Sequence, residues 1–258
     1  MKTIAIVNQK GGVGKTTTAV NLAAGLQILG KKVLCLDFDP QCHLAKYLGH
    51  RPDDKCCITD FVFAAATYMP APDAADLIRH SAAGIDYIPS SLRLSKADTV
   101  LAQAMSREQI LRDVLHAVVP DSYDYLLIDC NPSMGILMTN ALVAADRILI
   151  PVQTEEFSLD GLDDMMQLIQ MVKAKINPGL EILGLLPTLM SRTNDCREVV
   201  ELLRKDFPSL TFSTGIGRYA DAPKSVKKKI PVITLKGSKL GEQYMAASKE
   251  LLERLEEM

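Results

Sequence analysis

The sequence predicts an α/β protein in which one doubly wound, mostly parallel sheet carries helices on both faces. The first observation is an apolar run of strand length at residues 3–8, followed by a glycine-rich turn and a helical pattern over 19–29. The second is the recurrence of strand-length apolar runs at 33–37, 125–129 and 147–152. Helical patterns separate these runs, and strands that alternate with helices favour a parallel sheet.

Length and composition are those of an ordinary globular protein, and we expect one domain over residues 1–258. The loop begins at residue 9, so no helix-turn-helix extension is expected before it. The six cysteines show no Cys-x-x-Cys pair, which predicts reduced, mostly buried thiols in a cytoplasmic protein. Neither a signal peptide nor an apolar stretch near the ~20 residues that span a membrane is visible.

The glycine-rich turn has the form of a phosphate-binding loop. Gly11, Gly12 and Gly14 let the backbone turn tightly and approach a ligand, with N–H groups pointing at the start of a helix. Lys15 adds a positive charge for the β/γ-phosphates, and the Thr16 hydroxyl is placed to bind Mg²⁺. The alternative is a glycine turn without a ligand.

Two further strands end in carboxylates. Asp37 and Asp39 follow the run at 33–37, at the sheet edge where α/β proteins bind ligands. One of them could instead cap the next helix. Asp129 ends the run at 125–129 in a Walker B pattern, in which the carboxylate holds the Mg²⁺ shell through water.

The rest of the chain alternates between strand and helix patterns. Further strands are expected at 85–89, 182–190 and 212–216. Helices are expected at 74–79, 92–105, 107–118, 135–145, 162–176, 196–206 (capped by Asn194 or Asp195) and 240–258. The apolar stripe of the final helix and its many glutamates indicate that it docks on the domain rather than on a membrane.

A second lysine, at position 10, makes the loop more specific. The segments 8–23, 37–41 and 125–133 together resemble the ParA/MinD superfamily of deviant Walker A ATPases, and ParA (Soj) partition ATPases in particular. The resemblance implies that Lys10 reaches across an ATP-sandwich homodimer to the partner's phosphates. It also implies that Asp39 positions or activates the attacking water, with Lys10 and Lys15 as the other catalytic groups. The implied nucleotide-binding residues are Lys10, Gly11, Gly12, Val13, Gly14, Lys15, Thr16 and Thr17, and the implied Mg²⁺ residues are Thr16, Asp37 and Asp129.

Basic residues gather near the end of the chain. Residues 218–239 hold seven bases and one acid, a local charge of +6, so the remainder carries −8 in a chain of net −2. This asymmetry indicates either a polyanion-binding patch or a solvated loop. Arg192 lies in a segment that resembles the family's DNA-contact loop, whereas Asp221 stands where the family has an arginine. The expected DNA-binding residues are Arg192, Arg218, Lys224, Lys227, Lys228 and Lys229.

The resemblance implies an ATP-hydrolysing partition protein with ATP and Mg²⁺ as cofactors. Its dimer would bind DNA without sequence preference, associate with the nucleoid when ATP-bound, and respond to a ParB-like partner that stimulates hydrolysis. The segment 153–162 resembles the switch at the dimer face, although a loop and helix start explain it equally well. The alternatives are a MinD-like membrane-cycling regulator, which needs a basic amphipathic tail, an iron–sulfur carrier, which needs an interfacial cysteine pair, and a small-molecule kinase.

Overall fold

The computed structural model describes residues 1–53, 55–155 and 160–257, and within them seven strands form one sheet. The order across the sheet is β3-β4-β2-β5-β1-β6-β7, and every neighbouring pair is parallel except β3–β4. The strands are β1 (Lys2–Ile6), β2 (Val33–Phe38), β3 (Arg79–His80), β4 (Asp86–Ile88), β5 (Tyr125–Cys130), β6 (Arg147–Gln153) and β7 (Glu181–Thr188).

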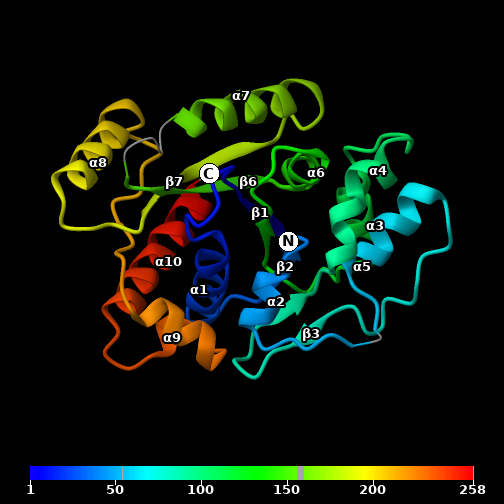
Figure 1. Cartoon of the computed structure of the whole chain (residues 1–258), viewed down its shortest axis with the longest axis horizontal. Helices are drawn as coiled ribbons and strands as arrows, with labels where there is room; N and C mark the ends of the chain where they lie inside the picture. The colour runs from blue at the N-terminus through cyan, green and yellow to red at the C-terminus, as the bar shows by residue number, and fades with distance from the viewer. Residues whose placement is uncertain (54, 156–159, 258) are drawn as a thin grey trace.

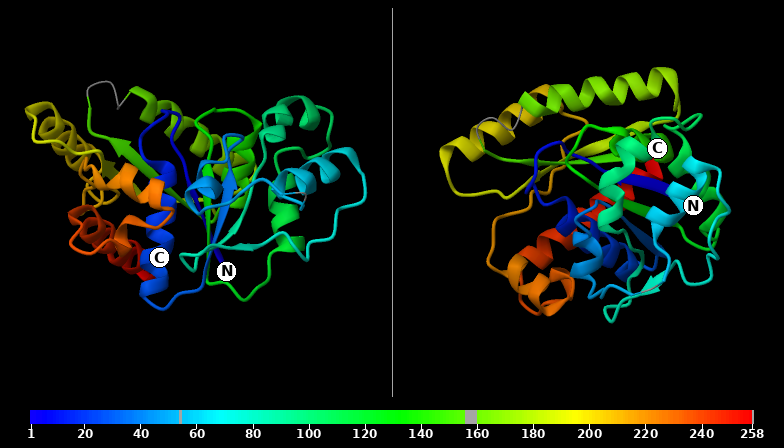
Figure 2. Two further views of the ribbon diagram at one scale, coloured as in Figure 1. Left: turned by 60° about the horizontal axis from the view of Figure 1, so that its bottom comes forward. Right: turned by 45° about the vertical axis from the view of Figure 1, so that its right-hand side comes forward.

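Helices cover both faces of this sheet (Figures 1 and 2), which confirms the predicted doubly wound fold. One face carries α3 (Ile58–Thr67), α4 (Ala97–Leu101), α5 (Ile110–Val118), α6 (Ile136–Ala144) and α7 (Asp160–Lys175). The other carries α1 (Lys15–Ile28), α2 (His43–Tyr47) and α10 (Lys239–Glu257), with α9 (Asp221–Lys228) and the 3₁₀ turn η2 (Val232–Thr234) beside them. α8 (Asn194–Asp206) follows β7, and the 3₁₀ turn η1 (Leu92–Lys96) precedes α4.

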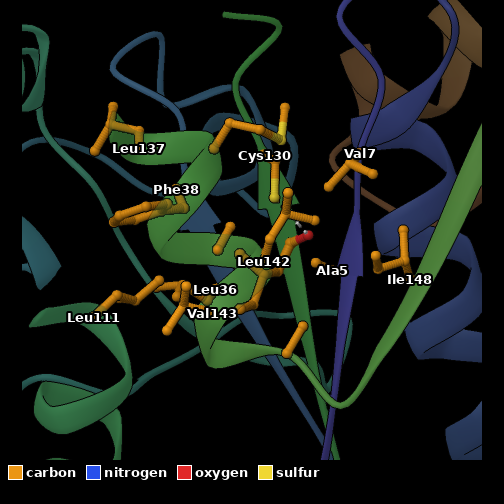
Figure 3. Close-up of a cluster of buried hydrophobic side chains, with 14 of the residues drawn as sticks. Ala5, Val7, Leu36, Phe38, Leu111, Cys130, Leu137, Leu142, Val143 and Ile148 are labelled. Carbon is orange, nitrogen blue, oxygen red and sulfur yellow. Dashed lines mark hydrogen bonds between the residues drawn. The ribbon is translucent and has the colours of Figure 1, made fainter. Parts of the chain in front are cut away.

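Alternation along the strands produces two cores. In β1, Ile4 and Ile6 face the α1 side, whereas Ala5 faces the α6 side together with Val7 just beyond the strand. Figure 3 shows Ala5 and Val7 grouped with side chains of α6 such as Leu142. Because both faces of the sheet are buried, the strands are continuously apolar, as buried parallel strands are.

Helices α1 and α10 pack closely against each other. A Cβ at Gly25 of α1 would collide with the side chain of Ser248 in α10, so glycine permits the close approach. Lys2 Nζ donates a 2.9 Å hydrogen bond to the carbonyl of Leu255. The apolar stripe of the final helix is buried, which agrees with the predicted docking on the domain.

Some predicted elements are wrong. Residues 74–79 form a turn and the short β3 instead of a helix, since the Asp73 carboxylate accepts the N–H of Ala75. The helix expected at 92–105 is broken into η1 and the short α4. The cap of α8 is Thr193, not Asn194 or Asp195, and its hydroxyl accepts from the N–H of Cys196.

The strand expected at 212–216 is also wrong. The segment pairs with β7 through two isolated bridges, Leu185 with Thr211 and Met190 with Gly217, and the N–H of Ile216 also donates to the Pro187 carbonyl at 2.8 Å. Between the bridges, the Glu250 carboxylate of α10 accepts the N–H groups of Ser213 and Thr214. A side chain therefore takes the place that a ladder partner would fill in a regular strand.

Candidate active site

The glycine-rich loop lies between β1 and α1, beside the end of β5. Gly12 and Gly14 have φ values of 78° and 91°, in the left-handed region that favours glycine. A Cβ at either position would meet no atom of the described chain within 4 Å, so the backbone borders open space. Gly14 caps α1 without a side-chain hydrogen bond, which leaves the first turn of N–H groups to an anion.

Lys15 is held inside the loop. Its side chain is buried, and Nζ donates to the carbonyls of Asn8 at 3.0 Å and Lys10 at 3.2 Å. Burial lowers the pKa of Lys15, while the charge of Asp129 raises it. The ammonium group is thus placed at the loop by carbonyl dipoles and has an opposite charge close by, a position from which it can bind phosphate.

Thr16 and Asp129 fit a magnesium ion. The Thr16 hydroxyl donates to Asp129 Oδ2 at 2.7 Å. Asp129 Oδ1 is buried and has no hydrogen-bond partner among the described residues. Burial raises the pKa of Asp129 to about 7, although the Thr16 hydrogen bond and Lys15 oppose the rise. A buried carboxylate oxygen without a partner, next to a hydroxyl, is suited to a hydrated divalent cation.

Asp37 lies beside Asp129 in the register of β2 and β5, and it is fully buried. Its two oxygens accept the N–H groups of Ala45, at 2.8 Å, and of Asp39, at 3.3 Å. Burial and then the charge of Asp129 raise the pKa of Asp37 well above its usual range. This geometry is that of the helix-capping alternative, because Ala45 lies in the first turn of α2, and a role near Mg²⁺ stays a prediction.

Asp39 lies in the loop that joins β2 to α2 and is partly exposed. Its Oδ1 accepts the N–H of Gln41 at 2.8 Å, which closes a tight turn. The charge of Asp39 contributes to the raised pKa of Asp129, so the two carboxylates are within electrostatic reach. The structure therefore brings Asp39, Lys15, Thr16 and Asp129 to one edge of the sheet.

Sequence reasoning missed several residues that support this site. Asn8 ties the loop to β6, since its Nδ2 donates to the Pro151 carbonyl and its Oδ1 accepts the N–H of Lys10. The Thr188 hydroxyl at the end of β7 donates to the Val13 carbonyl at 2.9 Å. Asn131 Oδ1, just after β5, is a second buried oxygen without a partner among the described residues. The available signal was position, because each follows or ends a strand at the ligand edge.

The loop also contacts the start of α7. Gly161 lies so close to Gln9 that a side chain at Gly161 would collide with it. The switch-like segment predicted at 153–162 is described only in part, because residues 156–159 lie outside the described chain. Within it, Glu155 pairs with Arg218 at 2.7 Å.

The expected DNA-binding residues divide into two groups. Arg192 is exposed in the loop after β7, and Arg218 lies next to that loop because its N–H donates to the Met190 carbonyl at 2.9 Å. The second group lies on α9, an element that the sequence analysis did not predict. There Lys227, Lys228 and Lys229 are exposed at the end of the helix, while Lys224 pairs with Asp221 at 3.6 Å.

Asp221 is held by its own neighbours. It lies in the first turn of α9, where a carboxylate is favourable. Its Oδ2 accepts a 2.9 Å hydrogen bond from the Ser238 hydroxyl. This acid therefore stabilises the basic helix, so its presence is compatible with a polyanion surface at the other end.

Comparisons with known proteins agree with this geometry. A family model described as an AAA domain (AAA_31) matches residues 1–182. The chain is 38% identical to the sporulation initiation inhibitor protein Soj of Bacillus subtilis, over 97% of this chain and 98% of that protein. It is 36% identical to the chromosome partitioning protein ParA of Caulobacter vibrioides, over 98% of this chain and 95% of that protein.

A solved structure has the same fold as this chain. The cobyrinic acid a,c-diamide synthase of Mycobacterium smegmatis, with bound ADP and magnesium, superimposes with a TM-score of 0.83 at 30% identity. The match covers 99% of this chain and 96% of that one. The same protein with a bound ATP analogue and magnesium gives a TM-score of 0.82.

Proposed function

Because the chain belongs to the ParA/Soj group of the ParA/MinD deviant Walker A superfamily, a family of P-loop ATPases, we propose that it is an ATP-hydrolysing partition or positioning protein. ATP and Mg²⁺ are its cofactors in this proposal. The observation that carries it is the cluster at the end of β1 and β5, in which Lys15, Thr16 and Asp129 meet at a helix start whose N–H groups receive no side-chain cap.

The chemistry is in-line transfer of the γ-phosphoryl group to water, catalysed by positioning and by neutralisation of charge. The loop N–H groups and Lys15 bind the phosphates. Thr16 and Asp129 would hold the Mg²⁺, which would supply positive charge to screen the phosphate oxygens. Asp39 orients the attacking water, because its carboxylate lies at the same edge of the sheet.

Two molecules close face to face around two ATP molecules in this proposal, with Lys10 contributing to the partner's phosphates. The dimer then binds DNA without sequence preference through Arg192, Arg218 and the lysines of α9, and so associates with the nucleoid. Support comes from their exposure and from the excess of positive charge in residues 218–239. A ParB-like protein attached to the cargo stimulates hydrolysis and releases the dimer.

The test measures binding to random-sequence duplex DNA with ATP, with ADP and without nucleotide, alongside phosphate release. We expect DNA binding with ATP only, together with slow basal hydrolysis. Lys10→Ala should still bind ATP, yet light scattering should show no ATP-dependent dimer. An ATPase that binds anionic vesicles rather than DNA would favour the MinD-like alternative. Bound iron in the purified protein would favour the iron–sulfur carrier.

For membrane association, one structural observation is relevant. No helix in the described part of the chain is long and apolar enough to cross a membrane.

A further inference from the structure

A buried polar junction lies between the nucleotide loop and the basic helix α9. The hydroxyl of Tyr47, the last residue of α2, lies 2.5 Å from the hydroxyl of Ser225 in α9. Both residues are buried, although α9 is otherwise largely exposed. Either hydroxyl can be the donor in this pair, and the Ser225 hydroxyl also lies 2.7 Å from the Ala222 carbonyl.

The same junction includes the helix that follows the glycine loop. Asn21 of α1 is fully buried, and its Nδ2 donates to the Thr17 carbonyl at 2.8 Å. Its Oδ1 accepts the N–H of Ile233 in η2, the turn that follows α9. Burial raises the pKa of Tyr47, while hydrogen bonds with Ser225, Asn21 and the Val232 backbone oppose that rise. The Tyr47 hydroxyl is thus the point where α1, α2, α9 and η2 meet.

At its other end, α2 is attached to the active site. The Asp37 carboxylate holds the N–H groups of Asp39 and Ala45, so one buried side chain joins the turn of Asp39 to α2. Only the turn through Cys42 separates them, and Cys42 has a left-handed φ of 55°, which is costly for a residue other than glycine. The turn of Asp39 and α2 are therefore joined by a short, constrained segment and by one shared carboxylate.

A second contact joins the segment after α2 to the end of α9. The aliphatic part of the Lys229 side chain lies against Gly49, where an added Cβ would come within 3.3 Å of it. Lys229 also has a left-handed φ, of 58°, at the end of the helix. The position of the three exposed lysines is hence fixed from the α2 side, through Ser225 and through Gly49. Figure 1 shows α2 and α9 as neighbouring elements at the lower edge of the molecule.

We infer that α2 and the Tyr47–Ser225 hydrogen bond transmit the state of the nucleotide site to α9, which makes Tyr47 a positioning residue for nucleotide-dependent binding of DNA. The inference rests on the proposed DNA-binding function and supplies its internal coupling. When the turn of Asp39 closes on a nucleoside triphosphate, α2 moves with it, and the lysines of α9 move into their DNA-binding position. Without the hydroxyl of Tyr47, α9 loses this link, and DNA affinity depends less on which nucleotide is bound.

The experiment compares Tyr47→Phe, Ser225→Ala and the double variant with the parent protein. Tyr244→Phe is the matched control, because Tyr244 also places a buried hydroxyl near α1, 3.3 Å from Thr18 Oγ1, but lies on α10. For each protein, affinity for a random-sequence duplex is measured with a non-hydrolysable ATP analogue and with ADP. Nucleotide affinity and thermal unfolding are measured in parallel.

The expected result is a fall of about fivefold in the ratio of the two DNA affinities for Tyr47→Phe and Ser225→Ala. The double variant should fall no further than either single variant, because both remove the same link. Nucleotide affinity should stay within about twofold, and Tyr244→Phe should keep the parent ratio. A merely structural role would lower both DNA affinities equally and leave their ratio unchanged, and that outcome would overturn the inference.

If the parent binds no DNA in either state, the proposed function fails, and the coupling is then judged by amide hydrogen exchange of residues 221–228. A difference between the ATP-analogue and ADP states in the parent, lost in Tyr47→Phe, would still support the link. Equal exchange in both states of the parent would overturn it.

Discussion

The glycine loop and the basic segment 218–239 both contain lysines, but the structure treats them in opposite ways. Lys15 is buried, and two carbonyls fix its position. Lys227 and Lys228 are exposed on the last turn of α9. The contrast shows that the loop is organised before its ligand arrives, whereas the basic segment presents charged side-chain ends to solvent, where each adds separately to the attraction of a polyanion. Substitutions in the first region should therefore give nearly complete losses, and those in the second graded ones.

The largest effect is expected in the glycine loop, when Lys15 is replaced. In Lys15→Ala, the β/γ-phosphates lose their charge partner inside the loop, so ATP affinity should fall by at least about 100-fold, within the range found for buried charged contacts. Fluorescent-nucleotide titration measures this effect. Lys96→Ala, at a surface position, is the control and should bind as the parent does. Micromolar affinity in Lys15→Ala would show that the loop is not the phosphate site.

Asp39 should separate binding from chemistry within the same region. Asp39→Ala removes the carboxylate that orients water, so hydrolysis should slow by about 100-fold, while ATP binding and ATP-dependent dimerisation are retained. Single-turnover phosphate release and light scattering measure the two properties. Asp39→Asn keeps the turn with Gln41 and distinguishes loss of the base from loss of the local fold. Unchanged turnover in both variants would contradict the assignment.

The basic segment should respond in proportion to charge. If a dimer makes ~6 phosphate contacts, the logarithm of its DNA affinity should fall with the logarithm of salt at a slope of about −5. Changing Lys227 and Lys228 to glutamate should weaken binding at least tenfold for all sequences and flatten the slope, with ATP affinity unchanged. Lys173 and Lys175 also lie in a last helical turn, that of α7, so the same change there is the matched control. A slope near zero in the parent would refute the DNA interface.

A further expected effect concerns the stability of the protein without ligand. The pKa of Asp129 is raised to about 7 from an ordinary value near 3.8, so between these pH values the folded state binds more protons than the unfolded state. Stability of the nucleotide-free protein should therefore fall as pH rises toward 7. In Asp129→Asn the contribution of Asp129 is absent, while Asp37, whose pKa is also raised, keeps part of the dependence. The variant should gain about 2–3 kcal/mol over the parent between pH 5 and pH 8.

Thermal unfolding at the two pH values measures that gain. With ATP analogue and Mg²⁺ present, the order should reverse, because only the parent keeps the carboxylate that holds the ion. A parent that stays less stable than Asp129→Asn under those conditions would contradict the proposed metal role.

Features that depend on local sequence patterns could be predicted, whereas features that depend on distant contacts could not. The loop, the buried strands and the carboxylates at their ends were visible because strand, glycine turn and helix are local patterns with fixed spacing. The sequence could not decide whether Asp37 caps a helix, because the helix concerned, α2, has only five residues and little apolar periodicity. The helix α9 was missed because it is short, mostly polar and contains Pro223. It is held by Ser225 and Asp221, whose partners Tyr47 and Ser238 lie outside the helix. The strand predicted at 212–216 was wrong for a related reason. The N–H groups of Ser213 and Thr214 donate to the carboxylate of Glu250, which lies in a distant helix.

The close packing of α1 on α10 has a consequence for how the protein is made. During synthesis, 211 positions separate the end of α1 at Ile28 from the start of α10 at Lys239. At ordinary ribosomal rates of about 5–20 residues per second, this interval lasts roughly 10–40 seconds. Helix α1 is therefore synthesised before α10, and the surface of α1 around Gly25 stays uncovered until α10 has been made. During synthesis, the helix that follows the phosphate loop thus lacks its packing partner until residues 239–257 have been added.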